Sequence, residues 1–344
     1  MAFELAKQGH QVKLFCVLGK REETEAFFAG VKNIEIIDYG PTRFLKENSS
    51  GLIQRGLVSM AVSKLFRRSL TMPHLELTRL VWKRRKDILD SQAVISIGMP
   101  FQIHWGMGLL KIFTGKAKDI PWVADCGDPF IGNSHASGNP FPYLKRISNR
   151  MLNKANAISV PVESQKLVYP VSMRDKIHII PQGFVIDINL PEYKVNEVPT
   201  FIYAGTFYEG LRDPRLLLNH LTKLSEPFVF HVYTRAVEFV RPFKEELGEK
   251  LVVHDYLPRE ELLKKLATAD FLVDFQNNSE SQVPSKLIDY GISKRPIMSI
   301  PFGELPEDKV SAFMKGNYQG LDLKIDVESH DIRTIARRFV DLLK

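Results

Sequence analysis

The chain has 344 residues, of which 44% are hydrophobic and 25% are charged, and this composition excludes a disordered, collagen-like or fibrous protein. The length favours two domains. Two cysteines, Cys16 and Cys126, are too few and too far apart for a disulfide framework or a thiolate metal site, so a reduced, cytoplasmic location is expected. The net charge is +7, and residues 41–90, with eleven Lys or Arg against four Asp or Glu, account for all of it.

The first half of the chain alternates apolar stretches of strand length with helix-like stretches. Near-continuous apolar strands are typical of parallel sheets that are buried on both faces. The chain opens directly on a helix, whereas a doubly wound domain begins with a strand and a glycine-rich turn, so we expect the first strand of this domain to be missing. The expected strands are 11–18, 33–39, 93–97, 121–125, 157–161 and 176–180, with helices at 21–31, 52–69, 75–90, 141–155 and 163–169.

A polar, proline-bearing stretch without periodicity, 186–200, is the expected linker. After it the alternation restarts, and repeated β-α units predict parallel sheets. The sequence therefore indicates two Rossmann-like domains, 1–185 and 201–344, that face each other across a cleft. The expected strands are 201–205, 228–234, 251–256, 271–275 and 296–300, with helices from Pro214, through 236–248, from Pro258, near Ser285 and over 329–343.

No stretch of the sequence has the pattern of a secretion signal or a membrane span. The first helix carries Glu4 and Lys7 where a signal needs an apolar core. The longest uncharged run, 91–110, contains several glycines and a proline, and is expected to form a buried strand, a loop and the start of a helix. The protein is therefore expected to be soluble or peripheral on a membrane.

The basic block has two interpretations. A surface this basic suits contact with phospholipid or nucleic acid, whereas many charge runs are solvated helix faces. Within it, Met60, Leu65 and Phe66 alternate with basic residues, as in helices that lie in a membrane interface, and packing of these side chains against the sheet is the alternative. No recognition motif accompanies the basic residues, so nucleic acid is not an expected partner.

Several common functional motifs are absent from the sequence. No G-x-G-x-x-G follows a strand and no G-x-x-x-x-G-K-[ST] occurs, which argues against dinucleotide and Walker-type sites. H-E-x-x-H, D-x-D and clusters of cysteine or histidine are also missing, so neither a metal nor a bound cofactor is expected. The G-x-S-x-G turn of many hydrolases is absent too.

The strongest positive signal is SESQVPSKLIDY at 279–290, which follows a predicted strand and opens a helix. Pro284 suits the first turn of a helix, and a neighbouring serine can cap it. Lys286 then lies in the first turn, where the helix dipole is already positive, so a cation is unfavourable there unless an anion binds nearby. Asp289 shares its face and can either hold Lys286 or accept ribose hydroxyls, with a simple solvated Lys–Asp pair as the alternative.

A second candidate for anion binding is GTFYEGLRDP at 205–214. The predicted strand ends in Gly205, and Asp213 followed by proline is typical of a helix start. Arg212 is then expected at the carboxyl edge of the sheet, where open α/β sheets bind ligands. Arg212 alone is more typical of an exposed charge, but with Lys286 it makes a clamp for a diphosphate.

These segments resemble the retaining, nucleotide-sugar-dependent glycosyltransferases of the GT-B fold, in the group known as family 4-like. VPSKLIDYGISKRPIMSI resembles their P-x-K-x-x-E-Y-x-x-x-x-x-P motif, and FIYAGTFYEGLRDP resembles the strand and loop that open the donor domain. AFELAKQGHQVKLF, IHIIPQGF and LPREELLKKLATADFLVDF resemble further segments of these enzymes in the same order. The resemblance covers essentially the whole chain and implies an α/β GT-B fold and sugar transfer that retains configuration and needs no metal.

The resemblance also implies roles for individual residues of the donor domain. Arg212 and Lys286, beside Gly205, would contact the donor diphosphate and stabilise the charge that grows on the leaving group. Asp289 would bind the ribose, and Tyr256 would lie near the base. The loop that would hold the sugar contributes Asn278, Ser281 and Gln282.

Two residues of the first domain are candidates for work on the acceptor. His104 and Asp128 each follow a predicted strand, and either could orient or deprotonate the acceptor hydroxyl. A structural role is the more common alternative for a lone His or Asp in such a loop. Acceptors in the resembling family are often lipid-linked, so the expected partners are a nucleotide-sugar, a glycan or lipid-linked acceptor, and an anionic membrane surface met by the basic helices at 52–86.

The sequence thus predicts a cytoplasmic or peripheral glycosyltransferase of polysaccharide or lipid-linked glycan. Two alternatives remain. One is a GT-B nucleotide-sugar epimerase. The other is a non-catalytic or truncated binding module, which is favoured by the missing first strand and by the displacement of the donor-motif glutamate to Glu280.

Overall fold

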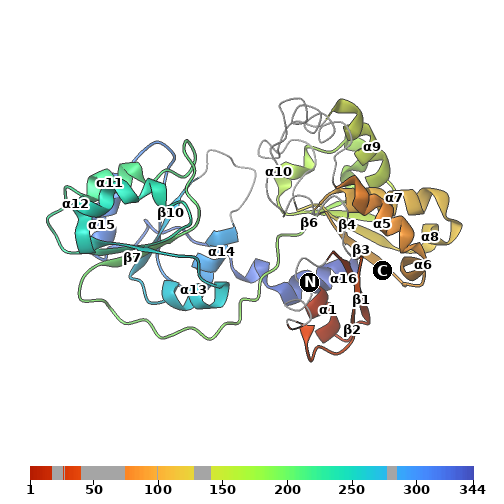
Figure 1. The fold of residues 1–344 in the computed structure, drawn as a ribbon, viewed down its shortest axis with the longest axis horizontal. Helices are drawn as coiled ribbons and strands as arrows, with labels where there is room; N and C mark the ends of the chain where they lie inside the picture. Colours follow the sequence, from red (N-terminus) through yellow and green to blue (C-terminus); the bar gives the residue numbers. More distant parts are fainter. Residues whose placement is uncertain (18–25, 27, 40–73, 99, 128–140, 277–284) are drawn as a thin grey trace, which may run out of the picture. The chain divides into compact units, whose positions relative to one another are not determined.

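The computed structural model describes residues 1–17, 26, 28–39, 74–98, 100–127, 141–276 and 285–344. The chain divides into two compact units (Figure 1). The first comprises Met1–Gly183 together with Ile332–Lys344, and the second comprises Phe184–Asp331. This division differs from the one expected from the sequence, because the C-terminal helix belongs to the first unit and the predicted linker, 186–200, to the second.

The first unit is built from parallel strands and helices, as the alternating pattern predicted. Four strands form one sheet in the order β3-β4-β5-β6, and β1 pairs with β2 in a separate parallel pair. The strands are β1 (Val12–Cys16), β2 (Ile34–Asp38), β3 (Val94–Ile97), β4 (Trp122–Asp125), β5 (Ala157–Val160) and β6 (Ile177–Ile179). The helices are α1 (Ala2–Lys7), α5 (Leu75–Lys83), α6 (Arg85–Leu89), α7 (Gln102–Phe113), α8 (Gly115–Asp119), α9 (Pro142–Leu152), α10 (Glu163–Lys166) and α16 (Ile332–Asp341), with a 3₁₀ turn at Val171–Lys176.

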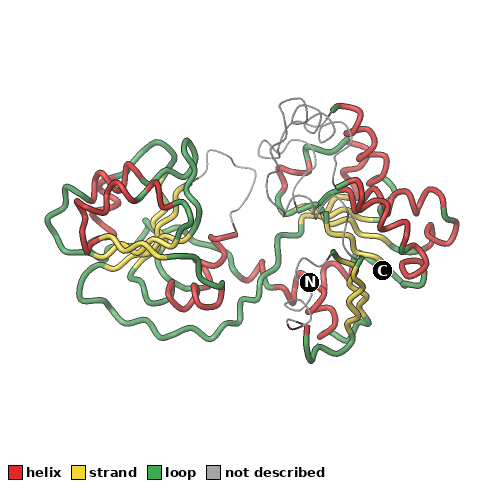
Figure 2. Tube along the Cα trace, viewed as in Figure 1, coloured by secondary structure: helices red, strands yellow, loops and turns green. Residues whose placement is uncertain are grey.

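The four-stranded sheet of this unit is buried between two helix layers (Figure 2). Successive side chains of a strand point to opposite faces. Trp122 and Ala124 of β4 therefore pack with α5, α7 and α9, whereas Val123 between them packs with Ile335 and Phe339 of α16. The amphipathic C-terminal helix predicted at 329–343 thus forms, and its apolar face covers one side of the first sheet.

Helix α7 packs very closely against its neighbours because of two glycines. A Cβ atom on Gly106 would lie 2.6 Å from the Val81 Cβ of α5, and one on Gly108 would lie 2.8 Å from the Met151 Cα of α9. Both distances are shorter than carbon atoms tolerate, so only glycine fits. The uncharged run 91–110 therefore contains strand β3 and the first part of α7, as predicted, but β3 is only partly buried, with Ile97 52% exposed.

The second unit contains a five-stranded sheet in the order β11-β10-β7-β8-β9, with every pair parallel. All five strands predicted in this half of the chain are present. The strands are β7 (Thr200–Ala204), β8 (Val229–Tyr233), β9 (Leu251–His254), β10 (Phe271–Phe275) and β11 (Ile297–Ile300). The helices are α11 (Arg215–Leu221), α12 (Lys244–Leu247), α13 (Arg259–Leu266), α14 (Ser285–Ile292) and α15 (Glu307–Met314), with 3₁₀ turns at Val237–Phe239, Arg241–Phe243, Gly248–Lys250 and Glu328–His330.

Helices cover both faces of this sheet (Figure 1). Aromatic side chains fill the core on one of these faces. The Phe201 ring of β7 lies between those of Phe230 and Phe271, with centroid distances of 4.7 Å to each. Tyr203 stacks on Phe207 at 4.5 Å. On the other face, Ile202 packs with residues of α13 and α14. These contacts fix β7 as the centre of the unit.

Strand β7 is also the point where the strand order reverses. From β7 the chain continues through β8 and β9 on one side, and then crosses to place β10 and β11 on the other. The carboxyl ends of β7 and β10 therefore form a topological switch point, and open α/β sheets bind their ligands at such points. The strand order alone therefore predicts that a ligand binds at the residues that follow β7 and β10.

Some of the predicted helices differ from the structure. The helix expected over 236–248 is broken into two 3₁₀ turns and α12, because Pro242 lacks the N–H that a continuous helix needs. The helix predicted at 52–69 lies outside the described residues, as do the apolar side chains Met60, Leu65 and Phe66, and the helix predicted at 21–31 lies largely outside them.

Candidate functional site

The candidate site lies at the carboxyl ends of β7 and β10, and Gly205 opens it. Gly205 follows β7 with φ 152°, in the region that favours glycine. A Cβ atom there would lie 3.1 Å from Tyr203 Oη and 3.7 Å from Lys286 Cδ. The stem of Lys286 of α14 therefore lies beside the end of β7, and the positive φ is what favours glycine at this position.

Lys286 is buried at this edge and forms an ion pair. Its Nζ lies 2.8 Å from Asp274 Oδ1 of β10 and 4.8 Å from the centroid of the Tyr203 ring. Burial lowers the pKa of Lys286, Asp274 raises it, and the charge of Arg212 lowers it again. The partner of Lys286 is therefore Asp274, and not Asp289 as one reading of the sequence had it.

Asp274 is itself held by a hydrogen bond on its second oxygen. Ser299 Oγ of β11 donates to Asp274 Oδ2 at 3.2 Å, and Gln276 Nε2 donates to Ser299 Oγ at 2.9 Å. Only 2% of Asp274 is exposed. A polar chain thus runs under the switch point and ends in the ammonium of Lys286.

Arg212 lies in the loop between β7 and α11, where the sequence placed it. Its backbone N donates to Tyr208 O at 3.0 Å, and Tyr208 N donates to Arg212 O at 3.2 Å, so the loop is a short hairpin. The Arg212 charge lowers the pKa of Lys286, which means that two cations share this edge. Two neighbouring cations favour an anionic ligand. Asp213 caps the start of α11, since its Oδ1 accepts from the backbone N of Arg215 at 3.0 Å.

Asp289 lies one turn after Lys286 on α14 and is engaged by α13. Arg259 Nε donates to Asp289 Oδ1 at 2.8 Å, and the same guanidinium donates to Val185 O at 3.3 Å. Burial raises the pKa of Asp289, and Arg259 opposes this effect. The aspartate is therefore a held carboxylate rather than a freely solvated one.

Tyr290 fastens α14 to the end of β7. Its hydroxyl accepts from Ala204 N at 2.8 Å and donates to Ala204 O at 3.3 Å, and 1% of the residue is exposed. Ala204 immediately precedes Gly205, so this contact sets the position of Lys286 and Asp289 relative to the glycine. The sequence identified the motif that contains Tyr290 but gave no reason to assign this role.

Tyr256 lies after β9 at the same edge of the sheet and is 65% exposed. The Arg235 guanidinium lies 4.7 Å from the centroid of its ring. Nearby, the Tyr233 and His254 rings stack at 4.4 Å, and His231 Nδ1 lies 2.9 Å from His254 Nε2. The Tyr233 and His254 rings stack on each other, whereas the exposed ring of Tyr256 suits an aromatic ligand group.

His104 of the first unit is completely buried, and it does not face solvent. Its Nδ1 lies 2.8 Å from Ser96 Oγ and its Nε2 lies 3.7 Å from Cys126 Sγ. Burial lowers the pKa of His104 to about 3. Gly98 leaves room for the ring, since a Cβ there would lie 2.3 Å from Nε2. A neutral, enclosed imidazole is not placed to deprotonate an acceptor, so the structural alternative describes His104 better.

Four predicted site residues lie outside the described residues: Asp128, Asn278, Ser281 and Gln282. Within the described parts of the chain, no three His, Cys, Asp or Glu side chains gather in a way that could hold a metal ion. No helix among these residues is long and apolar enough to cross a membrane.

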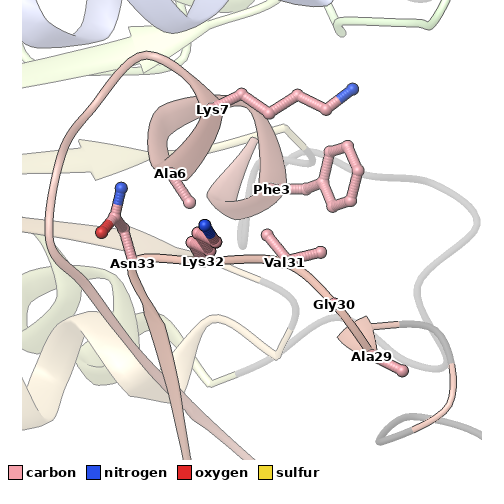
Figure 3. A pocket seen from close by; sticks show the side chains of 8 residues that line it. All are labelled: Phe3, Ala6, Lys7, Ala29, Gly30, Val31, Lys32 and Asn33. Atoms are coloured by element: carbon pink, nitrogen blue, oxygen red, sulfur yellow. The ribbon is translucent and has the colours of Figure 1, made fainter.

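Figure 3 shows a pocket of the first unit between α1 and the turn that precedes β2. Lys7 extends over the ring of Phe3, with Nζ 4.4 Å from the centroid. None of the predicted site residues lines this pocket, so it does not extend the site of the second unit. Its lining consists of Phe3, Ala6, Lys7, Ala29, Gly30, Val31, Lys32 and Asn33.

Comparison with known proteins identifies the fold. No protein-family model matches the chain, and no curated protein sequence matches it either. Among solved structures, a glycosyltransferase from Rickettsia africae ESF-5 matches 100% of this chain and 92% of its own, with a TM-score of 0.61 and 13% identity. HepE from Anabaena, solved in complex with UDP-glucose, matches 99% of this chain and 94% of its own, with a TM-score of 0.57 and 10% identity.

A third similar structure is that of TarM. It matches 78% of this chain with a TM-score of 0.53 and 17% identity, and the match spans only 58% of the TarM chain. At these identities the likeness concerns the fold. The chain therefore has the α/β GT-B fold, with two units that each contain a parallel sheet, as the sequence predicted.

Proposed function

We propose that this chain is a glycosyltransferase that moves a sugar from a nucleotide-sugar donor to a hydroxyl acceptor. The observation that carries the proposal is the pair of cations, Lys286 and Arg212, beside Gly205 at the switch point of the second unit. A diphosphate suits such a site because its charge matches both side chains and because glycine allows close approach. The GT-B fold supports this reading, since the similar Anabaena protein was solved with UDP-glucose.

In the proposed reaction, the bond between the anomeric carbon and the diphosphate oxygen breaks, the acceptor oxygen bonds to that carbon, and the acceptor hydroxyl gives its proton to Asp128. Negative charge grows on the leaving nucleoside diphosphate as its bond breaks. Cations that are already in position act best where charge develops. Lys286 and Arg212 would take this role, so the proposal includes a reaction that needs no metal ion. It also includes retention of the anomeric configuration, which rests on the sequence resemblance alone.

The remaining parts of the donor are assigned by position. Asp289 is held by Arg259 through Oδ1, and we assign the ribose hydroxyls to its other oxygen. Tyr256, with the Arg235 guanidinium over its ring, is assigned to the base, because flat faces of this kind stack on aromatic rings. The sugar is assigned to Asn278, Ser281 and Gln282, and the acceptor hydroxyl to Asp128.

The proposed acceptor is a glycan or lipid-linked glycan, and the proposed place of action is the cytoplasmic face of an anionic membrane. A described surface of the first unit supports this. Trp82 is 37% exposed and Phe113 is 70% exposed, and their rings meet edge to face at 6.5 Å. The Arg85 guanidinium lies 5.7 Å from the centroid of the Trp82 ring, and the exposed Lys83 directly follows Trp82 in the sequence. Aromatic side chains among cations are typical of interfacial contact.

Product analysis tests the proposed function. The protein is incubated with single nucleotide-sugars, with and without a glycan acceptor, and nucleoside diphosphate release is measured. Acceptor-dependent release that is lost in Lys286→Ala supports sugar transfer, whereas release without acceptor indicates the epimerase alternative. Lys111→Ala is the matched control, because Lys111 is also a buried lysine but belongs to the first unit. Absence of release with every donor, from a protein that unfolds cooperatively, contradicts the proposal.

Liposomes test the membrane part separately. We expect the protein to sediment with vesicles that contain phosphatidylglycerol, and the double variant Trp82→Ser with Phe113→Ser to sediment less. Binding should also decrease as salt is raised. Equal sedimentation of the wild type with neutral and anionic vesicles would remove the anionic membrane from the proposal.

A further inference from the structure

We infer that Asp274 is a positioning residue of the donor site, and that its carboxylate holds the Lys286 ammonium in place for the diphosphate. The inference rests on the proposed function and names a residue that the donor motif does not contain. Asp274 is the fourth of the five residues of the apolar strand β10, directly below the ligand edge, and acts only through Lys286.

Lys286 needs a nearby negative charge to remain protonated. A buried ammonium loses its proton readily unless an opposite charge lies close to it. The groups that face Lys286 are the Tyr203 ring from β7, Asp274 from β10 and the Arg212 charge from the β7–α11 loop. Among these groups Asp274 is the acid that offsets the burial of the ammonium, because burial raises the pKa of Tyr203 and keeps its hydroxyl neutral at pH 7.

The Lys286 ammonium also has to be held in one position. A lysine side chain has four methylene groups and many rotamers, so an unrestrained ammonium does not present one geometry to a ligand. Here the stem of Lys286 runs beside Gly205, since a Cβ atom on that glycine would lie 3.7 Å from Lys286 Cδ, and the ammonium is paired with Asp274 Oδ1 at 2.8 Å. Asp274 is fixed in turn by Ser299 at its other oxygen. Supporting contacts of this kind are what keep a binding group in its productive position.

The buried pair of Asp274 and Lys286 is not explained by stability. A buried ion pair adds little stability compared with apolar side chains of similar size, whereas the loss of one partner is strongly unfavourable. Stability alone therefore does not require Asp274 and Lys286 in the core of this unit. A lysine that must contact an anion does require a counter-ion while the site is empty.

The test uses binding of UDP, measured by calorimetry between pH 6.5 and 9, with the wild type, Asp274→Asn and Asp270→Asn. Asp270 is the matched control, because it is a buried aspartate at the opposite end of β10 that accepts from Tyr193 and Thr200 rather than from Lys286. We expect the Kd of Asp274→Asn to rise about tenfold or more at pH 7.5, which is the size of a charge-assisted contact. The ratio to the wild-type Kd should increase with pH, because Lys286 then loses its proton. Asp270→Asn should keep the wild-type profile.

A second measurement does not depend on any nucleotide. Asp274→Asn leaves a buried ammonium without its counter-ion, so the variant should melt below the wild type at pH 7 and recover as the pH is raised to 9.5. The double variant Asp274→Asn with Lys286→Met removes both charges and should show no such recovery.

The outcomes separate the two claims. If the wild type binds no nucleotide, the proposed function fails, and the melting series alone decides whether Asp274 keeps Lys286 charged. If the wild type binds UDP and Asp274→Asn binds equally or more tightly with the same pH profile, Asp274 does not position Lys286 and the inference is overturned.

Discussion

The hydroxyl of Tyr290 takes the place of a missing strand partner at the switch point, and this gives the most specific prediction of the structure. Strand β10 pairs with β7 only at Phe201 and Ile202, so the two strands have separated before Ala204. At that level the Tyr290 hydroxyl meets both Ala204 N and Ala204 O, at 2.8 and 3.3 Å. Tyr290→Phe removes the oxygen and leaves the ring in place.

The expected cost follows from the two backbone groups that lose their partner. A buried polar group left without a hydrogen bond costs about 1–3 kcal/mol. Two such groups cost about 2–6 kcal/mol together. For a domain of this size, each kcal/mol lowers the Tm by about 2–4 °C, so a decrease of at least about 4 °C is expected for the second unit. Because Gly205 and Lys286 lie on either side of this contact, the Kd for a nucleoside diphosphate should also rise.

Thermal unfolding of the wild type, Tyr290→Phe and Tyr208→Phe measures this directly. Tyr208 is 51% exposed, and an exposed substitution of this kind changes stability by less than about 0.5 kcal/mol. If Tyr290→Phe melts with the wild type, the hydroxyl does not replace a strand partner, and the reasoning about the switch point is wrong.

Three further predictions concern stability and its pH dependence. Burial lowers the pKa of His104 to about 3 in the folded chain. Below pH 6.5 the unfolded chain therefore binds a proton at His104 that the folded chain does not bind, and the free energy of unfolding falls by about 1.4 kcal/mol per pH unit toward pH 3. The melting curves of His104→Asn should show less of this loss, and an unchanged slope would contradict it. Gly205→Ala should lower the free energy of unfolding in urea by about 1–3 kcal/mol and weaken nucleotide binding, since φ 152° is unfavourable for alanine. Equal urea midpoints for this variant and the wild type would show that the backbone at Gly205 is not strained by a side chain. Arg259→Met removes the cation that opposes the raised pKa of Asp289 and should therefore lower the Tm. The difference in Tm from the wild type should become smaller as the pH falls toward 4, because the Asp289 carboxyl group then takes up a proton. A difference that does not change with pH would show that the charge pair is not its cause.

The sequence predicted the parts of the fold that local patterns determine. Apolar strands and the helix signals between them located all five strands of the second unit, because buried parallel strands and helix caps are encoded within a few residues. The break in the helix predicted at 236–248 was missed although Pro242 signals it. The position of α16 against the first sheet could not be predicted, because the contacts of Ile335 and Phe339 join residues far apart in the chain.

The same distinction applies to the site. Gly205, Arg212 and Lys286 were selected as candidates because each follows a strand or opens a helix, and the structure places them at the carboxyl edge of the second sheet. Asp274 was missed, although a single acid inside the apolar strand FLVDF is an unusual feature that needs a buried partner. The hydrogen bonds of Tyr290 were out of reach of local patterns, since the hydroxyl binds a residue 86 positions away.

The central claim is that the switch point of the second unit binds the diphosphate of a nucleotide. Calorimetric titration of the wild type, Lys286→Ala and the control Lys111→Ala with UDP, GDP, ADP and CMP tests it most directly. We predict that one nucleoside diphosphate binds best, that Lys111→Ala keeps this affinity, and that Lys286→Ala weakens it by about 10–100-fold, the value of a charge-assisted contact. Equal affinity of Lys286→Ala and the wild type, or no binding of any nucleotide by a cooperatively folded wild type, would contradict the claim.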